Sequence, residues 1–126
     1  MKRLIAEIPF VPYGFRQDGN DYSCEPSHQE IQFAIDKGQL EDRGFQTHLD
    51  ELSSEWASNA RSLQEFADRQ REYNARRIAY FVVHGWTDPI TLTAAGNMRD
   101  GLHRLKAAIF LGKDEVEVIV LNDDVK

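Results

Sequence analysis

The 126-residue sequence has one cysteine, Cys24, and no long run of apolar residues. A single cysteine excludes an intramolecular disulfide and any zinc site that needs a cysteine pair. No segment approaches the roughly 18 apolar residues of a membrane-spanning helix. The N-terminus reaches Glu7 and Pro9 too early for the apolar core of a signal peptide. We therefore expect one cytoplasmic domain, residues 1–126, with an ordinary hydrophobic core.

Charge is unevenly distributed along the chain, whose net charge is −6. Residues 17–68 hold twelve acidic and three basic side chains, whereas residues 69–113 hold three acidic and eight basic ones. Two interpretations follow: solvated helix faces of opposite sign, or an anionic ligand on the basic half.

The N-terminal half predicts one strand followed by helices. Residues 4–10 alternate between apolar and other side chains, which predicts a strand, and residues 14–26 are polar and predict a loop. A capping box at Ser27 predicts a helix that ends at Gly38.

Two further helices are predicted before the last third of the chain. Apolar residues at spacings of three and four predict a helix from Leu49 to Phe66. The pattern is lost at Arg69–Glu72 and resumes as a separate helix, Tyr73–Val83, with Gly85 after its end.

The C-terminal third alternates between strands, turns and a helix. Ile90 and Leu92 are predicted to face inward, and the last strand, apolar apart from Glu117, is predicted to be covered on both faces. The predicted order is strand, turn, short strand, helix and strand, over residues 90–93, 95–97, 98–99, 103–111 and 116–121. The predicted class is α+β, with a small mixed sheet and packed helices.

The turn Asp100–Arg104 has the features of a phosphate-binding site. The first N–H groups of a helix have no intrahelical acceptor and carry partial positive charge. Gly101 allows close approach of an anion to the backbone, and His103 and Arg104 add donors that suit phosphate oxygens. Asp100 would cap the helix or orient one of these side chains. In the alternative interpretation, Asp100 is an N-cap only, and His103 and Arg104 are surface residues.

The order and spacing of these motifs resemble the ParB/sulfiredoxin-like fold. The resemblance covers about residues 70–121, and residues 11–69 match no pattern of that family and form a helical insertion. Members carry a helix that ends in glycine, a Pro-Ile strand, an Asp-Gly-x-His-Arg turn with an Ala-rich helix, and a Val-rich strand. The corresponding segments here are Gly85–Leu92, Asp100–Ala108, Leu111-Gly112 and Val116–Val120.

The resemblance implies that the turn binds a nucleoside phosphate, such as ATP or CTP with Mg²⁺, or the phosphates of a nucleic acid. It carries over Asp100, Gly101, His103 and Arg104 as candidate binding or catalytic residues. Leu102 departs from the family, because sulfiredoxins have their catalytic cysteine and segregation CTPases a metal-serving glutamate at this position. Sulfur chemistry at Leu102 is thereby excluded and a metal ligand is lost.

Two functions remain open. The first is a phosphate-binding protein, with or without phosphohydrolase or nuclease activity, in which His103 and Arg104 stabilise the charge on the phosphate. The second is a non-enzymatic interaction or inhibitor protein, of the kind made by phages and mobile elements, that binds a basic partner through acidic residues 17–68. The sequence leaves the oligomeric state open.

Other candidate residues are each compatible with a structural role. Three carboxylates would serve as a base or metal ligand if they lay near the turn: Glu7, Asp88 and Glu117. Of the four histidines, His28, His48, His84 and His103, none has metal-ligand spacing. The arginines of Arg69–Arg71 and Arg76–Arg77 flank Tyr73, which predicts either a nucleic-acid backbone contact or solvated charges.

Overall fold

In the computed structural model, residues 1–44 and 63–122 are described. The chain is a small α+β protein that divides into two compact units. The first combines Met1–Val11 with Phe81–Lys126, and the second is Pro12–Tyr80. No helix in the described ranges is long and apolar enough to cross a membrane.

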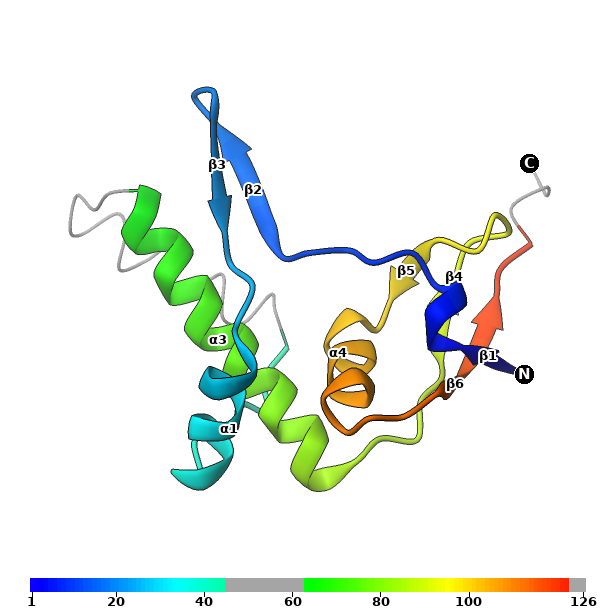
Figure 1. The fold of residues 1–126 in the computed structure, drawn as a ribbon. Helices are drawn as coiled ribbons and strands as arrows, with labels where there is room; N and C mark the ends of the chain where they lie inside the picture. Colours follow the sequence, from blue (N-terminus) through cyan, green and yellow to red (C-terminus); the bar gives the residue numbers. More distant parts are fainter. Residues whose placement is uncertain (45–62, 123–126) are drawn as a thin grey trace. The chain divides into compact units, whose positions relative to one another are not determined.

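The first unit contains a mixed four-stranded sheet in the order β1-β6-β4-β5 (Figure 1). Its strands are Lys2–Leu4 (β1), Ile90–Leu92 (β4), Met98–Asp100 (β5) and Glu115–Val120 (β6). Strand β6 runs parallel to β4 and antiparallel to β1, whereas β4 and β5 are antiparallel. The mixed sheet agrees with the fold class predicted from the sequence.

Helix α4, Leu102–Phe110, packs against one face of this sheet. Ile90 and Leu92 of β4 are fully buried and face the core, as predicted. The remaining buried members of the cluster are Ile8, Leu105, Ala108, Val116 and Val118. The helix ends as predicted before Gly112, whose φ of +74° is in the left-handed region.

Strand β6 is covered on one face only, so the prediction that both faces are covered was wrong. Val116 and Val118 are buried, but Glu117 and Ile119 point to the other side, and Ile119 is 50% exposed. The prediction was wrong because Ile119 is apolar although it is exposed. Its presence among the valines gives the strand a nearly continuous apolar sequence, which is typical of a strand buried on both faces.

The predicted first strand over residues 4–10 was also wrong. Strand β1 ends at Leu4, and Ile5–Glu7 form a 3₁₀ turn. The Ile5 N–H donates to the Asp114 carbonyl, and the Ile8 N–H donates to the Ile5 carbonyl. The first bond continues the register of β1 with β6 by one residue, and the second closes the 3₁₀ turn, after which Ile8 still reaches the core.

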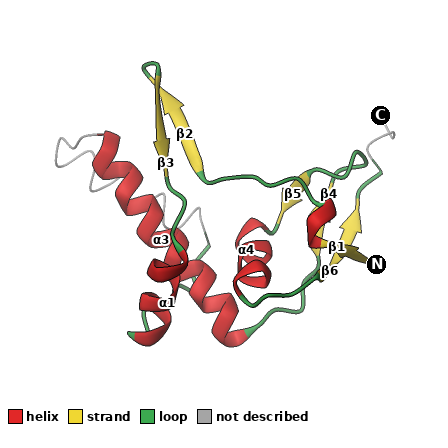
Figure 2. Cartoon of the chain, in the orientation of Figure 1, coloured by secondary structure: helices red, strands yellow, loops and turns green. Residues whose placement is uncertain are grey.

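The second unit begins with a β-hairpin where a loop was expected. Strands β2 (Gly14–Gln17) and β3 (Asn20–Ser23) pair antiparallel around Asp18-Gly19 (Figure 2). Both turn residues have positive φ, +54° and +78°, as a type I′ turn requires. Phe15 and Tyr22 face each other across the strands with ring centroids 5.0 Å apart, which gives this polar segment its apolar contact.

Helix α1, His28–Asp36, begins at the predicted capping box. Ser27 Oγ accepts from the Glu30 N–H, and the Glu30 carboxylate accepts from the Ser27 N–H. The helix ends before Gly38, which has a φ of +67°. The prediction was correct at both ends because each signal is local.

Helix α3 runs continuously from Leu63 to His84. The predicted break at Arg69–Glu72 was therefore wrong. Gln70 and Asn74 are buried polar residues, and they interrupt the apolar stripe without interrupting the helix. Gly85 follows the helix with a φ of +75°, as predicted. The predicted helical residues before Leu63 lie outside the described ranges.

Candidate phosphate-binding site

Gly101 is the N-cap residue of α4 and has a φ of +104°. A Cβ atom here would lie 3.0 Å from Arg104 Nη2 and 3.2 Å from Ile90 Cγ1. The backbone conformation therefore favours glycine, and the two neighbouring side chains leave little room for a Cβ atom. Gly101 has no side chain to accept the first N–H groups of the helix, and the first turn contains no acidic residue.

Asp100 is the last residue of β5 and is not the N-cap of α4. Its carboxylate lies 3.5 Å from Arg104 Nη2, and its side chain is 76% exposed. Of the two roles considered for Asp100, the geometry therefore matches orientation of a neighbouring side chain, here Arg104. The pair contributes little to stability, because an exposed ion pair is screened by solvent.

Arg104 lies in the first turn of α4 with its guanidinium turned toward the backbone. Its Nη1 donates to the carbonyl oxygens of Asp88 at 2.9 Å and of Pro89 at 3.1 Å, and only 13% of the side chain is exposed. Arg104 thus joins α4 to the residues that precede β4. Both of its terminal nitrogens have partners in the protein, Nη1 at these carbonyls and Nη2 at the Asp100 carboxylate, which limits its role as a phosphate donor.

The two remaining residues of the turn differ in exposure and chemistry. Leu102 is partly buried and packs against the core cluster, so an apolar residue at this position has a structural explanation. His103 is the second residue of α4 and is partly exposed. The donors that best suit an incoming anion are therefore the backbone N–H groups of the first turn and the His103 imidazole.

The three candidate carboxylates lie in different surroundings. Asp88 is next to the turn, where its backbone carbonyl accepts from Arg104. Glu117 lies 3.3 Å from the N-terminal amine on the exposed side of β6. Glu7 lines a groove along α4. Within residues 1–44 and 63–122, no three His, Cys, Asp or Glu side chains are grouped to hold a metal ion.

The aromatic residue between the arginines of α3, Tyr73, does not lie at the surface. Tyr73 is fully buried, and its hydroxyl donates to the Arg43 carbonyl at 3.0 Å. Arg71 pairs with Glu30 and Asp68, each at 3.0 Å. Tyr73 is thus not part of the surface, and contact of the arginines with a nucleic-acid backbone stays a prediction.

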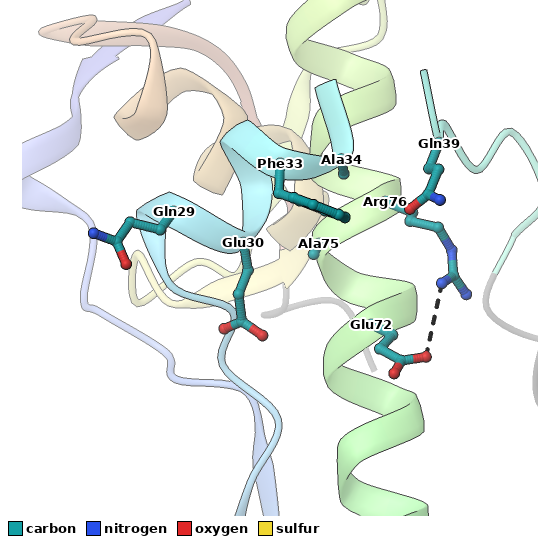
Figure 3. Close-up of a pocket in the computed structure, with 8 residues that line it drawn as sticks. All are labelled: Gln29, Glu30, Phe33, Ala34, Gln39, Glu72, Ala75 and Arg76. Carbon is teal, nitrogen blue, oxygen red and sulfur yellow. Dashed lines mark ion pairs between the residues drawn. The ribbon is translucent and has the colours of Figure 1, made fainter. Parts of the chain in front are cut away.

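A second hollow lies between α1 and α3 and has a volume of about 550 Å³. Phe33 is 56% exposed and extends from α1 toward α3 above Ala75 (Figure 3). Glu72 and Arg76 form an ion pair at 3.9 Å along its edge. The remaining lining residues are Gln29, Glu30, Ala34 and Gln39. The sequence did not indicate this hollow, because Phe33 is an isolated aromatic residue.

Two carboxylates of the second unit have pKa values below their usual range. The Arg43 guanidinium donates two hydrogen bonds to Glu41 and lowers its pKa against the opposing effect of burial. Burial raises the pKa of Glu30, but hydrogen bonds from the Ser27 backbone and Arg71 outweigh it. Both groups therefore hold the unit together as carboxylates.

Cys24 in the second unit and Lys106 in the first are buried side chains with reactive groups. Burial raises the pKa of the Cys24 thiol, which makes it a poor nucleophile. The Lys106 ammonium lies 3.7 Å from the centre of the Phe10 ring, and the residue is only 6% exposed. The sequence did not predict the burial of Lys106, since no local pattern shows that residues 5–11 cover this side of α4.

Comparison of the chain with protein-family models, with curated proteins and with solved structures found no match.

Proposed function

We propose that this chain binds the phosphate group of a nucleotide or nucleic acid at the N-terminus of α4, as a protein of the ParB/sulfiredoxin-like type. One observation carries the proposal, namely the difference between the two nine-residue helices. Helix α1 begins with a complete capping box, whereas α4 begins at a glycine and has no carboxylate in its first turn. An anion at α4 would satisfy N–H groups that Ser27 and Glu30 satisfy at α1.

Each residue of the turn has a role in this proposal. His103 donates to the phosphate, and Gly101 permits its approach. Arg104 donates to the carbonyl oxygens of Asp88 and Pro89, which fixes the turn, and its guanidinium adds positive charge near the helix N-terminus. Leu102 offers no metal ligand. The Mg²⁺ of a nucleoside triphosphate such as ATP or CTP would therefore be held by the phosphates of the nucleotide. Hydrolysis, as a phosphohydrolase or nuclease, is a separate property of the same site.

The test is His103→Glu, measured by calorimetric titration with ATP, CTP, GTP, ADP and a short oligonucleotide, with and without Mg²⁺. A glutamate in the first turn stabilises a helix by about 0.3–1 kcal/mol through the helix dipole but repels phosphate. We expect the variant to be as stable as the wild type or more so, with binding reduced at least about tenfold. Release of inorganic phosphate, measured in parallel, reports on hydrolysis.

His28→Glu is the matched control, because His28 is the first residue of α1 and the substitution makes the same change in charge. It should leave binding unchanged. The proposal is wrong if no nucleotide or oligonucleotide binds the wild type, or if His28→Glu and His103→Glu weaken binding equally.

The hollow between α1 and α3 supports a second proposal, that the acidic residues 17–68 bind a basic protein. Phe33 would supply the apolar contact, and Glu72, which follows that range and pairs with Arg76, would add a carboxylate at the edge. The test is affinity capture by Phe33→Ala and by Glu72→Lys. Loss of the same captured partner by both variants, with unchanged circular dichroism, supports this function. Retention of the partner by both contradicts it.

A further inference from the structure

The hollow between α1 and α3 is lined only by residues of the second unit and has a volume of about 550 Å³. This volume is in the range of about 300–1,000 Å³ that is typical of small-molecule sites. Ala34 of α1 and Ala75 of α3, both buried, line it with small side chains. A small ligand in this hollow is independent of the phosphate proposed at α4 and of the basic partner proposed above.

One cation and one anion of the lining are held together only loosely. Arg76 Nη1 and Glu72 Oε2, both of α3, are 3.9 Å apart, which is beyond hydrogen-bond distance. Their side chains are 35% and 63% exposed. In the part of the chain that the structure describes, neither side chain makes a hydrogen bond. An exposed pair contributes little to stability, so a ligand that bonds to both groups replaces a weak contact.

The third charged residue that lines the hollow, Glu30, is already paired. Its carboxylate accepts from a backbone N–H and from Arg71 Nε. Glu41 lies near Arg76, but hydrogen bonds within the protein already engage its carboxylate oxygens. An anion in the hollow would therefore be repelled by Glu72, and a cation would be repelled by Arg76. A zwitterion offers a partner to each of these two groups.

Phe33 adds an apolar surface beside the two charges. Its side chain extends from α1 toward α3, where Glu72 and Arg76 form their ion pair (Figure 3), and the residue is 56% exposed. An exposed ring packs favourably against a second aromatic ring. The Lys37 ammonium lies 5.7 Å from the centre of the Phe33 ring and is not part of the lining. The lining therefore matches a zwitterion that has an aromatic body.

We propose that this hollow binds a free α-amino acid with an aromatic side chain. Its carboxylate contacts Arg76, whose planar guanidinium suits a carboxylate, and its ammonium contacts Glu72. Both charged groups of an α-amino acid are attached to the same carbon atom, so they can reach two groups that lie 3.9 Å apart. The aromatic ring packs against Phe33, beside the two alanines. No bond is made or broken.

The probe is L-phenylalanine, titrated into ¹⁵N-labelled protein at pH 7 in parallel with three analogues that each lack one group. Phenethylamine lacks the carboxylate, 3-phenylpropionate lacks the ammonium, and L-alanine lacks the ring. We expect amide shifts in α1 and around Glu72 and Arg76, with a Kd on the order of 1 mM for phenylalanine. Each analogue should bind about threefold more weakly, or worse.

Two single variants assign the charged groups of the ligand. Arg76→Gln should weaken phenylalanine about threefold or more without weakening phenethylamine. Glu72→Gln should weaken phenylalanine to the same extent without weakening 3-phenylpropionate. The double variant Glu72→Arg with Arg76→Glu exchanges the two charges and should bind phenylalanine better than either single variant, because the zwitterion can bind in the reverse orientation.

Arg16→Gln is the matched control. Arg16 also forms an exposed ion pair and follows an aromatic residue, Phe15, but it lies outside the hollow, so its loss should leave binding unchanged. The inference is overturned if phenylalanine does not bind, if an analogue binds equally well, or if Arg76→Gln keeps the preference for phenylalanine over phenethylamine. Capture of a basic protein through Phe33, without binding of phenylalanine, would overturn this inference and leave the second proposed function standing.

Discussion

Arg104→Ala tests whether this arginine holds the turn that starts α4. In the wild type, Nη1 donates to the carbonyl oxygens of Asp88 and Pro89 at 2.9 and 3.1 Å. A hydrogen bond with a charged partner contributes about 1.5–3 kcal/mol, so two at the lower limit give about 3 kcal/mol. The exposed Asp100 pair adds little. Water can reach the exposed carbonyl of Asp88 and compensate in part, which leaves an expected loss of about 2–3 kcal/mol.

The assay is urea unfolding followed by circular dichroism at pH 7, with the midpoint and the slope fitted separately. A lower midpoint at unchanged slope indicates a change in stability alone. Arg99→Ala is the matched control, because Arg99 is exposed in β5 nearby, and its loss should stay within about 0.5 kcal/mol.

Arg104→Lys refines the same test. A lysine keeps the charge but lacks the planar fork, so it should recover less than half of the lost stability. The reasoning is refuted if Arg104→Ala costs less than about 1 kcal/mol, or if Lys restores the wild-type midpoint. Either result would mean that the carbonyl contacts do not hold the turn.

Three further predictions concern stability. Gly101→Ala should lower the free energy of unfolding in urea by about 1–3 kcal/mol, because Gly101 has a positive φ. Gly44→Ala is the control, since a Cβ atom at Gly44 meets open space, and it should have little effect. Equal losses in the two variants would contradict this prediction. The pKa of Glu41 is lowered, so the stability that its carboxylate contributes is present above its usual pKa of 4.5 and is lost as the pH falls below that value. Glu41→Gln should therefore reduce the fall in unfolding free energy at acid pH. The same pH dependence in the variant and the wild type would contradict this prediction. Val118→Ala should cost about 2 kcal/mol in thermal unfolding but Ile119→Lys less than about 0.5 kcal/mol, and similar costs would argue against an open sheet face.

Local signals in the sequence predicted those elements whose ends depend on neighbouring residues. The capping box at Ser27 and the glycines at Gly38, Gly85 and Gly112 fix helix ends through bonds within a few residues. The same kind of signal was present at Asp18-Gly19, a dipeptide that favours a hairpin turn. It was overlooked because the surrounding segment is polar, although Phe15 and Tyr22 occupy paired positions.

Features that depend on distant residues could not be predicted in this way. The position of the α4 turn was predicted from Gly101, but the acceptors of Arg104 lie 16 and 15 residues earlier in the chain. The Phe10 ring that lies against the Lys106 ammonium is almost a hundred residues away, and the Arg43 carbonyl that accepts from the Tyr73 hydroxyl is 30 residues away. The residue types in the sequence therefore indicated the position of a candidate anion site. Which of its hydrogen-bond donors face solvent depends on contacts with residues far away in the chain.

The position of β6 in the sheet has a consequence for the order in which the chain folds. Strand β6 lies between β1 and β4, and the Met1 amine bonds to the Val118 carbonyl across a separation of 117 residues. During synthesis, β1 is made long before β6, its neighbour in this sheet, and cannot pair until β6 has also been made. Such long-range pairing slows folding. The β4–β5 pair and α4 can form earlier, so arrival of β6 completes the first unit in a single late step.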